Sequence, residues 1–164
     1  MKPALLVIDM QKQYRKLGGA FQESIDQAAK YVAWAISIFK AKGLPIFHIV
    51  HHEGGPEELE SDDFWELDAV AAPDRKDVIV KTKGSAFAGT DLDARLRAAG
   101  ADVLVLTGLS AEYCVLSTMR AAESLGWNAV FLRGALASSE PANIPFVERI
   151  SDVVSTGALL AFLG

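Results

Sequence analysis

The sequence predicts an α/β protein in which a parallel sheet of about six strands lies between two layers of helices, a three-layer, Rossmann-like αβα arrangement. Short runs of branched apolar residues alternate with longer segments in which apolar residues recur every three or four positions. The first run, Ala4–Ile8, contains no polar residue, which is typical of a strand buried on both faces and therefore of a parallel sheet. Strands that alternate with helices at these lengths predict right-handed crossovers with helices on both faces of the sheet.

Composition limits the possible functions. The chain has 164 residues, of which 51% are hydrophobic and 23% charged, and this favours one globular domain over residues 1–164. The net charge of -5 argues against a nucleic-acid or anionic-membrane partner, because both require a basic face. No apolar run approaches the roughly 18 residues of a membrane span. The single cysteine cannot form an internal disulfide, which favours a reducing, cytoplasmic location.

The first half of the chain contains three expected strands and one long helix. Asp9 ends the first strand, and residues 11–22, with two adjacent glycines, are typical of a loop. A helix is expected from Glu23 to Lys42, and a second apolar stripe on it (Tyr31, Trp34 and Ile38) predicts contact with another helix or another subunit. The second strand is expected over residues 45–50 and the third over residues 77–82, with an acidic, irregular segment at 56–74 between them.

The second half continues the alternation. The pattern predicts helices over 91–99, from Cys114 to about Leu125, and over 156–163, with a helical turn at 146–150. It predicts strands over 102–106, 128–132 and 152–154. The last helix is strongly apolar, so it also favours self-association into a homo-oligomer.

Three residues with chemical potential are expected to meet at one edge of the sheet. If the first three strands wind outward on one side and the fourth begins the other side, a crevice lies between strands one and four, at their carboxyl ends. Asp9 follows strand one, Lys83 follows strand three and Cys114 follows strand four. Each also has a simpler interpretation, because such an Asp often caps a turn, a Lys beside a Gly-Ser turn is usually solvated, and a lone Cys usually packs. An acid, a base and a nucleophile at one ligand-binding edge favour the catalytic interpretation.

The same residues carry a resemblance to a known family. Asp9-Met10-Gln11, Lys83 with Ser85-Ala86-Phe87, and the segment Gly108–Val115 followed by Ser117–Ala122 resemble the motifs of the isochorismatase-like cysteine hydrolases. The motifs occur in the order of the family, and the resemblance extends over nearly the whole chain.

The resemblance implies an Asp-Lys-Cys triad at Asp9, Lys83 and Cys114. It also implies a cis peptide bond between Leu109 and Ser110, and an oxyanion hole formed by the backbone N–H groups of Ser110 and Cys114. A nearby ammonium and a helix start would both favour the thiolate of Cys114. Members of the family cleave small amides, carbamoyl compounds or the vinyl ether of isochorismate, and a cysteine nucleophile favours C–N hydrolysis of a small molecule through a thioester. No cofactor is implied.

The histidines distinguish this chain from the metal-dependent members. Nicotinamidases of the superfamily carry an Asp-x-His pattern and a further His after strand two, whereas His48, His51 and His52 have no Asp two residues before them. His51 and His52 are adjacent and point to opposite faces of a strand, so we expect no catalytic metal, and His48 is expected to be packed or hydrogen-bonded. A metal-dependent nicotinamidase and a non-catalytic binding or scaffold protein stay open as alternatives. The expected pocket residues are Gln11, His52, Trp65, Phe87 and Tyr113, with Phe64 as a further aromatic candidate.

Overall fold

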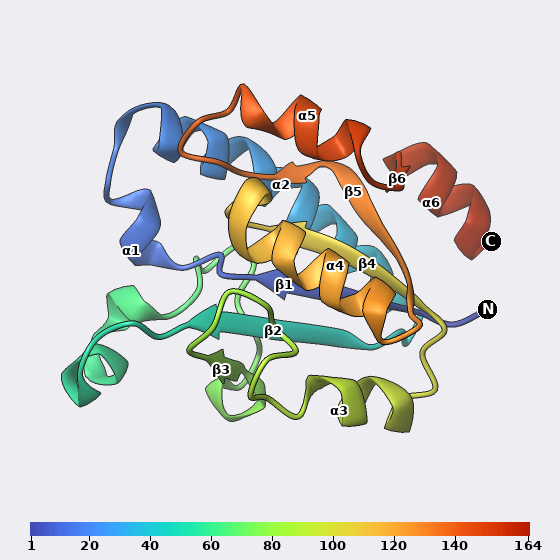
Figure 1. Cartoon of the computed structure of the whole chain (residues 1–164), viewed down its shortest axis with the longest axis horizontal. Helices are drawn as coiled ribbons and strands as arrows, with labels where there is room; N and C mark the ends of the chain where they lie inside the picture. Colours follow the sequence, from blue (N-terminus) through green and yellow to red (C-terminus); the bar gives the residue numbers. More distant parts are fainter.

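The computed structural model describes residues 1–164 and contains one six-stranded parallel sheet (Figure 1). The strand order is β3-β2-β1-β4-β5-β6. The order reverses between β1 and β4, as predicted, so the crevice at their carboxyl ends is the expected position of a ligand site. The strands are β1 (Pro3–Ile8), β2 (Ile46–His51), β3 (Ile79–Lys81), β4 (Val103–Gly108), β5 (Asn128–Leu136) and β6 (Val153–Val154).

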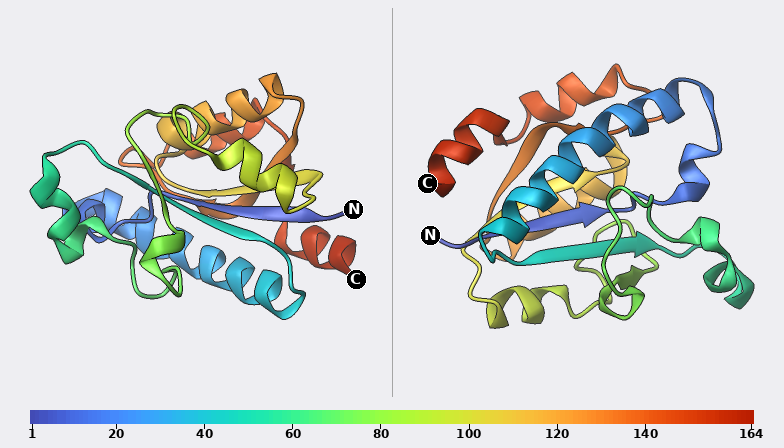
Figure 2. Two further views of the ribbon diagram at one scale, coloured as in Figure 1. Left: turned by 90° about the horizontal axis from the view of Figure 1, so that it is seen from below. Right: turned by 180° about the vertical axis from the view of Figure 1, so that it is seen from behind.

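Helices cover both faces of the sheet. On one face lie α2 (Gly19–Ala41) and α6 (Thr156–Leu163), and on the other lie α3 (Leu92–Ala98), α4 (Leu116–Ser124) and α5 (Asn143–Arg149). The left view of Figure 2 shows the two layers on either side of the strands. The shorter elements are α1 (Lys12–Arg15), the π-helical η4 (Ala111–Val115), and the 3-10 helices η1 (Pro56–Glu60), η2 (Asp62–Phe64) and η3 (Arg75–Asp77).

Two hydrophobic clusters explain why β1 has no polar residue. Leu5 and Val7 belong to the cluster that contains Val32 and Phe39 of α2. Their neighbours Ala4, Leu6 and Ile8 belong to the opposite cluster, with the buried residues of α3 and α4. Every residue from Ala4 to Ile8 is fully buried, because alternate side chains of a strand enter opposite layers.

Two segments differ most from the expected boundaries. Residues 11–22 are not a loop, because α1 occupies Lys12–Arg15 and α2 begins at Gly19. Gly18, with φ of 73°, turns the chain between these helices. The two glycines therefore lie at the junction of two helices and not in a long irregular segment. The fifth strand continues to Leu136 instead of ending at 132, through Gly134, whose φ of 86° bends it without a Cβ penalty.

The second apolar stripe of α2 lies partly at the surface. Tyr31 is 42% exposed, and Trp34 is half-buried beside α6. A surface hollow of about 550 Å³ runs between the two helices, lined by Gln27, Lys30, Tyr31, Trp34, Thr156, Gly157 and Leu160. Tyr31 and Trp34 share this hollow with residues of α6, and contact of the stripe with another helix or another subunit stays a prediction. None of the helices is both long enough and apolar enough to span a bilayer.

Candidate active site

Asp9 stands at the carboxyl end of β1 in an unusual backbone conformation. Its φ of 54° lies in the left-handed region, which side chains other than glycine rarely adopt. Such strain persists where the surrounding structure enforces it, and it is concentrated at functional sites. The side chain is buried, and one carboxylate oxygen, Oδ1, has no hydrogen-bond partner in the protein. That oxygen is therefore free to accept a proton.

Gly108, the last residue of β4, makes this conformation possible. Its φ is 115°, and a Cβ at this position would lie 1.9 Å from the carbonyl oxygen of Ile8. The same carbonyl accepts a hydrogen bond from the N–H of Leu109 at 3.0 Å. Only glycine allows the ends of β1 and β4 to approach so closely, and this approach places the loop after β4 beside Asp9.

Lys81 supplies the ammonium of the site, which corrects the prediction that Lys83 does so. Lys81 is the last residue of β3 and is 1% exposed. Its Nζ lies 2.9 Å from Asp9 Oδ2 and 3.3 Å from Cys114 Sγ. The side chain of Lys83 is exposed, and only its backbone carbonyl enters the site, where it accepts a hydrogen bond from Lys81 Nζ at 3.1 Å. The third strand is expected from the sequence to end at residue 82, which makes Lys83 the first lysine beyond it. The strand ends at Lys81, and this lysine contacts Asp9 and Cys114.

Cys114 lies on η4, the π-helical turn that leads into α4. Short π-helical segments are rare and frequent at functional sites. The residue is half-buried, and its carbonyl accepts a hydrogen bond from Thr118 Oγ1 at 2.7 Å. The predicted cis peptide bond between Leu109 and Ser110 is present immediately before η4.

The electrostatics of the site favour a protonated thiol, contrary to the expected thiolate. Burial, followed by the charge of Asp9, raises the pKa of Cys114 to about 12, and Lys81 opposes this only in part. Burial also raises the pKa of Asp9 to about 6, although the ammonium of Lys81 lowers it. At neutral pH the resting pair is therefore a neutral thiol beside a carboxylate. The thiol proton must be removed during a reaction rather than before it.

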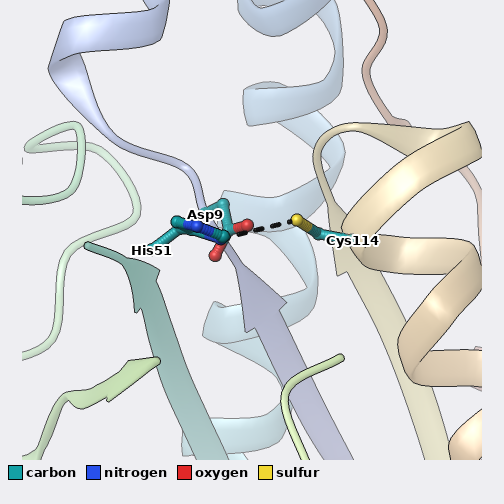
Figure 3. A group of neighbouring side chains, drawn as sticks. All are labelled: Asp9, His51 and Cys114. Carbon is teal, nitrogen blue, oxygen red and sulfur yellow. Dashed lines mark hydrogen bonds between the residues drawn. The ribbon is translucent and has the colours of Figure 1, made fainter. Parts of the chain in front are cut away.

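His51 is a fourth member of the cluster that the sequence analysis did not place in the site. It is the last residue of β2, next to Lys81 in the register of the sheet, and Figure 3 shows its ring beside Asp9 and Cys114. Its Nδ1 lies 2.7 Å from Lys81 Nζ and 3.7 Å from Cys114 Sγ. Burial and then the charge of Lys81 lower the pKa of His51, so the imidazole is neutral at pH 7. Its position directly after an apolar strand, like that of Asp9, was the signal available in the sequence.

The side chain of Gln11 does not point into a pocket and instead connects the end of β2 to the backbone of Phe64. Its side chain is fully buried, and its Nε2 donates to the carbonyls of His51 at 3.1 Å and Phe64 at 2.7 Å. Its Oε1 accepts from the N–H of His51 at 2.8 Å. The backbone of Gln11 also forms an isolated antiparallel bridge with Glu66. The amide therefore ties the end of β2 to the acidic segment at residues 56–74.

The contacts of the other expected pocket residues are with neighbouring side chains and backbone. The ring of His52 packs edge-on against Phe64, and its Nε2 lies 3.1 Å from the carbonyl of Gly55. Trp65 packs against Phe64 and beneath the guanidinium of Arg75. Phe87 is half-buried against the hydrophobic core, and Tyr113 is 66% exposed. A role for any of these side chains in substrate binding stays a prediction.

A metal ion does not suit this cluster. One donor atom each from Asp9, His51 and Cys114 lies within 4.8 Å of the others, a spacing that could surround a cation. Lys81 Nζ contacts all three, so an ammonium already provides the positive charge among them. His48 does not join them, because its Nδ1 pairs with Glu66 in the core at 2.7 Å, which confirms the expectation of a hydrogen-bonded histidine. His48 and His51 thus bond to Glu66 and to Lys81, and the absence of a catalytic metal stays a prediction.

Comparisons with known proteins identify the family of the chain. The family model described as the Isochorismatase domain matches residues 3–146. The uncharacterized isochorismatase family protein YddQ of Bacillus subtilis is 30% identical over 145 residues, which cover 85% of this chain and 79% of YddQ. The N-carbamoylsarcosine amidase of an Arthrobacter species is 25% identical over 188 residues, covering 99% of this chain and 71% of that protein.

A solved structure extends the comparison to the fold. The nicotinamidase/pyrazinamidase PncA from Bacillus subtilis superimposes with a TM-score of 0.81 at 25% identity, covering 94% of this chain and all of that chain. The relatives thus include amidases, and the family model spans most of the sequence. The chain belongs to the isochorismatase family of hydrolases.

Proposed function

We propose that residues 1–164 form one hydrolase unit that cleaves a C–N bond of a small amide or carbamoyl compound at Cys114 without a metal ion. The observation that carries this proposal is the position of the Lys81 ammonium, which lies 2.9 Å from the Asp9 carboxylate and 3.3 Å from the Cys114 sulphur. An acid–base group, a cation and a nucleophile in contact at the crevice between β1 and β4 constitute the parts of covalent amide hydrolysis. The amidases among the relatives support the same reaction class.

The chemistry follows from the charges of the site. Asp9 accepts the thiol proton while the sulphur forms a bond to the amide carbon, because the raised pKa of the thiol disfavours a free thiolate beforehand. The oxygen of the tetrahedral intermediate is stabilised by the backbone N–H groups of Ser110 and Cys114 at the start of the helix. Asp9 returns the proton to the leaving nitrogen as the C–N bond breaks. Water then hydrolyses the thioester, giving the acid and the free thiol.

Ammonia release tests the reaction class. The purified protein is expected to release ammonia from at least one member of a panel of small primary amides and carbamoyl compounds that includes nicotinamide and N-carbamoylsarcosine. Cys114→Ala is expected to abolish the release, because no other cysteine is present in the chain. Quenching during turnover and mass spectrometry of the intact chain are expected to show the mass of the acyl group on the native protein and none on Cys114→Ala.

Two outcomes would contradict the proposal. Activity that survives in Cys114→Ala would exclude a thioester, and no release from any member of the panel would favour a binding or scaffold protein with this fold. Stoichiometric zinc in the purified protein, with activity lost on chelation, would instead support a metal-dependent nicotinamidase.

The dependence of activity on pH tests the role of Asp9. The pKa of Asp9 is raised to about 6, so below that pH the carboxylate is protonated and cannot accept the thiol proton. We expect kcat/KM to fall about tenfold per pH unit below about pH 6 and to be level just above it. The folded state favours protonated Asp9, so this residue contributes stability that is present at low pH and is lost as the pH rises from about 4 to 6.

Loss of activity on acidification is therefore not caused by unfolding that Asp9 drives. Circular dichroism over the same pH range serves as the control for the fold. In His51→Asn, where no second base is present, a profile of kcat/KM that stays level down to pH 5 with the fold intact would exclude Asp9 as the proton acceptor.

A further inference from the structure

The ammonium of Lys81 is surrounded by one more hydrogen-bond acceptor than it has protons to donate. It carries three protons, and four acceptor atoms lie around it. These are Asp9 Oδ2 at 2.9 Å, His51 Nδ1 at 2.7 Å, the carbonyl of Lys83 at 3.1 Å and Cys114 Sγ at 3.3 Å. The first three are the shorter contacts and suit the neutral thiol. A thiolate would accept more strongly than a thiol, so ionisation of Cys114 draws a Lys81 proton toward sulphur and away from one of the other acceptors.

His51 is an acceptor whose Nδ1 can itself bind a proton once Lys81 no longer donates to it. Because Lys81 is only a donor, Nδ1 of His51 must carry the lone pair, and the ring proton of neutral His51 resides on Nε2. Nε2 lies 3.2 Å from Glu53 Oε1, which can accept that proton in a hydrogen bond. Glu58 holds the turn that carries Glu53, accepting from the N–H groups of Glu53 at 3.1 Å and Gly54 at 2.7 Å.

We propose that His51, oriented by Glu53, is a second proton acceptor for Cys114, so that either of two bases can generate the nucleophile. In this step the S–H bond of Cys114 breaks and an N–H bond forms at Nδ1 of His51, while a Lys81 proton turns from Nδ1 to the sulphur. Two ion pairs result, thiolate with ammonium and imidazolium with the carboxylate of Glu53. The inference deepens the proposed function, on which it rests, by adding a catalytic residue to the same site.

The surroundings of His51 are consistent with this role. The charged and titratable groups that face it are Lys81, Asp9 and Cys114 on one side and the acidic residues Glu53 and Glu58 on the other, with His52 adjacent in the chain. Burial and Lys81 lower the pKa of His51, while the two glutamates raise it. The net shift is downward, so the ring is neutral and able to accept a proton at neutral pH.

Alkylation of Cys114 by iodoacetamide tests the step without any amide substrate. His51→Asn places an amide oxygen near the position of Nδ1, so the variant can still accept a hydrogen bond from Lys81 but cannot take up a proton. We expect its alkylation rate at pH 7.5 to be roughly tenfold lower than that of the native protein. The rate is not expected to fall to zero, because Asp9 remains as the other base. In Asp9→Asn, the rate is expected to retain an acid limb that disappears when His51→Asn is added.

Glu53→Gln provides a second route, because the side chain of Glu53 is 71% exposed and its replacement does not disturb the core. Loss of this exposed carboxylate is expected to slow alkylation only about two- to fivefold, and to have little further effect in His51→Asn. Glu57→Gln, an exposed glutamate on η1, is the matched control and is expected to react like the native protein.

The outcomes separate the two proposals. Alkylation rates of His51→Asn and Glu53→Gln within twofold of the native rate, with an unchanged pH profile, would overturn the role of His51. A rate that depends on His51 in a protein that hydrolyses no amide would support this role and contradict the proposed function. Thermal unfolding of each variant shows that a lower rate does not result from loss of the fold.

Discussion

Lys81→Met is expected to lower kcat/KM for the cleaved amide by about 10²- to 10³-fold, the cost of removing one preorganised charge from a reaction centre. The substitution keeps the length and apolar character of the buried stem while removing the only cation in contact with Asp9 and Cys114. It also leaves Asp9 as a buried carboxylate without a partner, which is expected to reduce the free energy of unfolding at pH 7 by about 3–5 kcal/mol.

The dependence of this destabilisation on pH identifies its cause. Without Lys81, the pKa of Asp9 in the folded variant rises further, so the stability deficit should shrink as the pH falls and Asp9 becomes protonated. Urea unfolding at pH 7 and at pH 5 measures both values.

Lys83→Ala is the matched comparison for Lys81→Met. It removes an exposed side chain and keeps the backbone carbonyl that Lys81 contacts, so kcat/KM is expected to stay within about threefold of the native value. Activity lost in Lys83→Ala but retained in Lys81→Met would restore the assignment that the sequence motif suggested.

Gly108→Ala is expected to have the largest effect on the fold of any single methyl addition at this edge. The new Cβ would lie 1.9 Å from the carbonyl oxygen of Ile8, a backbone atom that cannot move without separating β1 from β4. The left-handed φ of 115° adds conformational strain to this clash. Together they are expected to cost on the order of 3–5 kcal/mol in the free energy of unfolding, measured by urea denaturation.

Gly89→Ala distinguishes the two contributions. Gly89 also has a left-handed φ, of 71°, but no atom lies within 4 Å of the position of its Cβ. Its substitution is expected to cost only about 1–2 kcal/mol, from conformational strain alone. Equal losses in the two variants would show that close approach of β1 and β4 is not the reason for glycine at 108.

The two helical layers and the parallel pairing could be predicted because local pattern determines them. The uninterrupted apolar run of β1 required two covered faces, and the alternation of strands with helices required parallel pairing. The turn at Gly18 was misinterpreted because two adjacent glycines mark a break in the chain without indicating what lies on either side. A single turn of helix such as α1 has too few residues for a periodic pattern to appear.

The site was predicted in part. Asp9 and Cys114 follow long, unambiguous strands, so their positions at the sheet edge could be inferred. Lys81 and Lys83 lie two residues apart and therefore share one face of an extended chain, and only the end of the three-residue β3 decides which of them is enclosed. His51 was considered only as a metal ligand, and rejected as one, because its partners, Lys81 and Glu53, come from the sheet register and a local turn that a motif does not specify.

The double attachment of Gln11 has a consequence for how this protein can vary. One amide fixes both the root of the chain that leaves β2 and the carbonyl of Phe64, where that chain returns. The intervening residues 52–63 leave the end of β2 and return at Phe64, and the same side chain anchors both ends of this segment. Insertions or deletions after Glu58 can therefore be accommodated while the reacting atoms, and the contacts of Glu53 and Glu58 beside His51, keep their spacing.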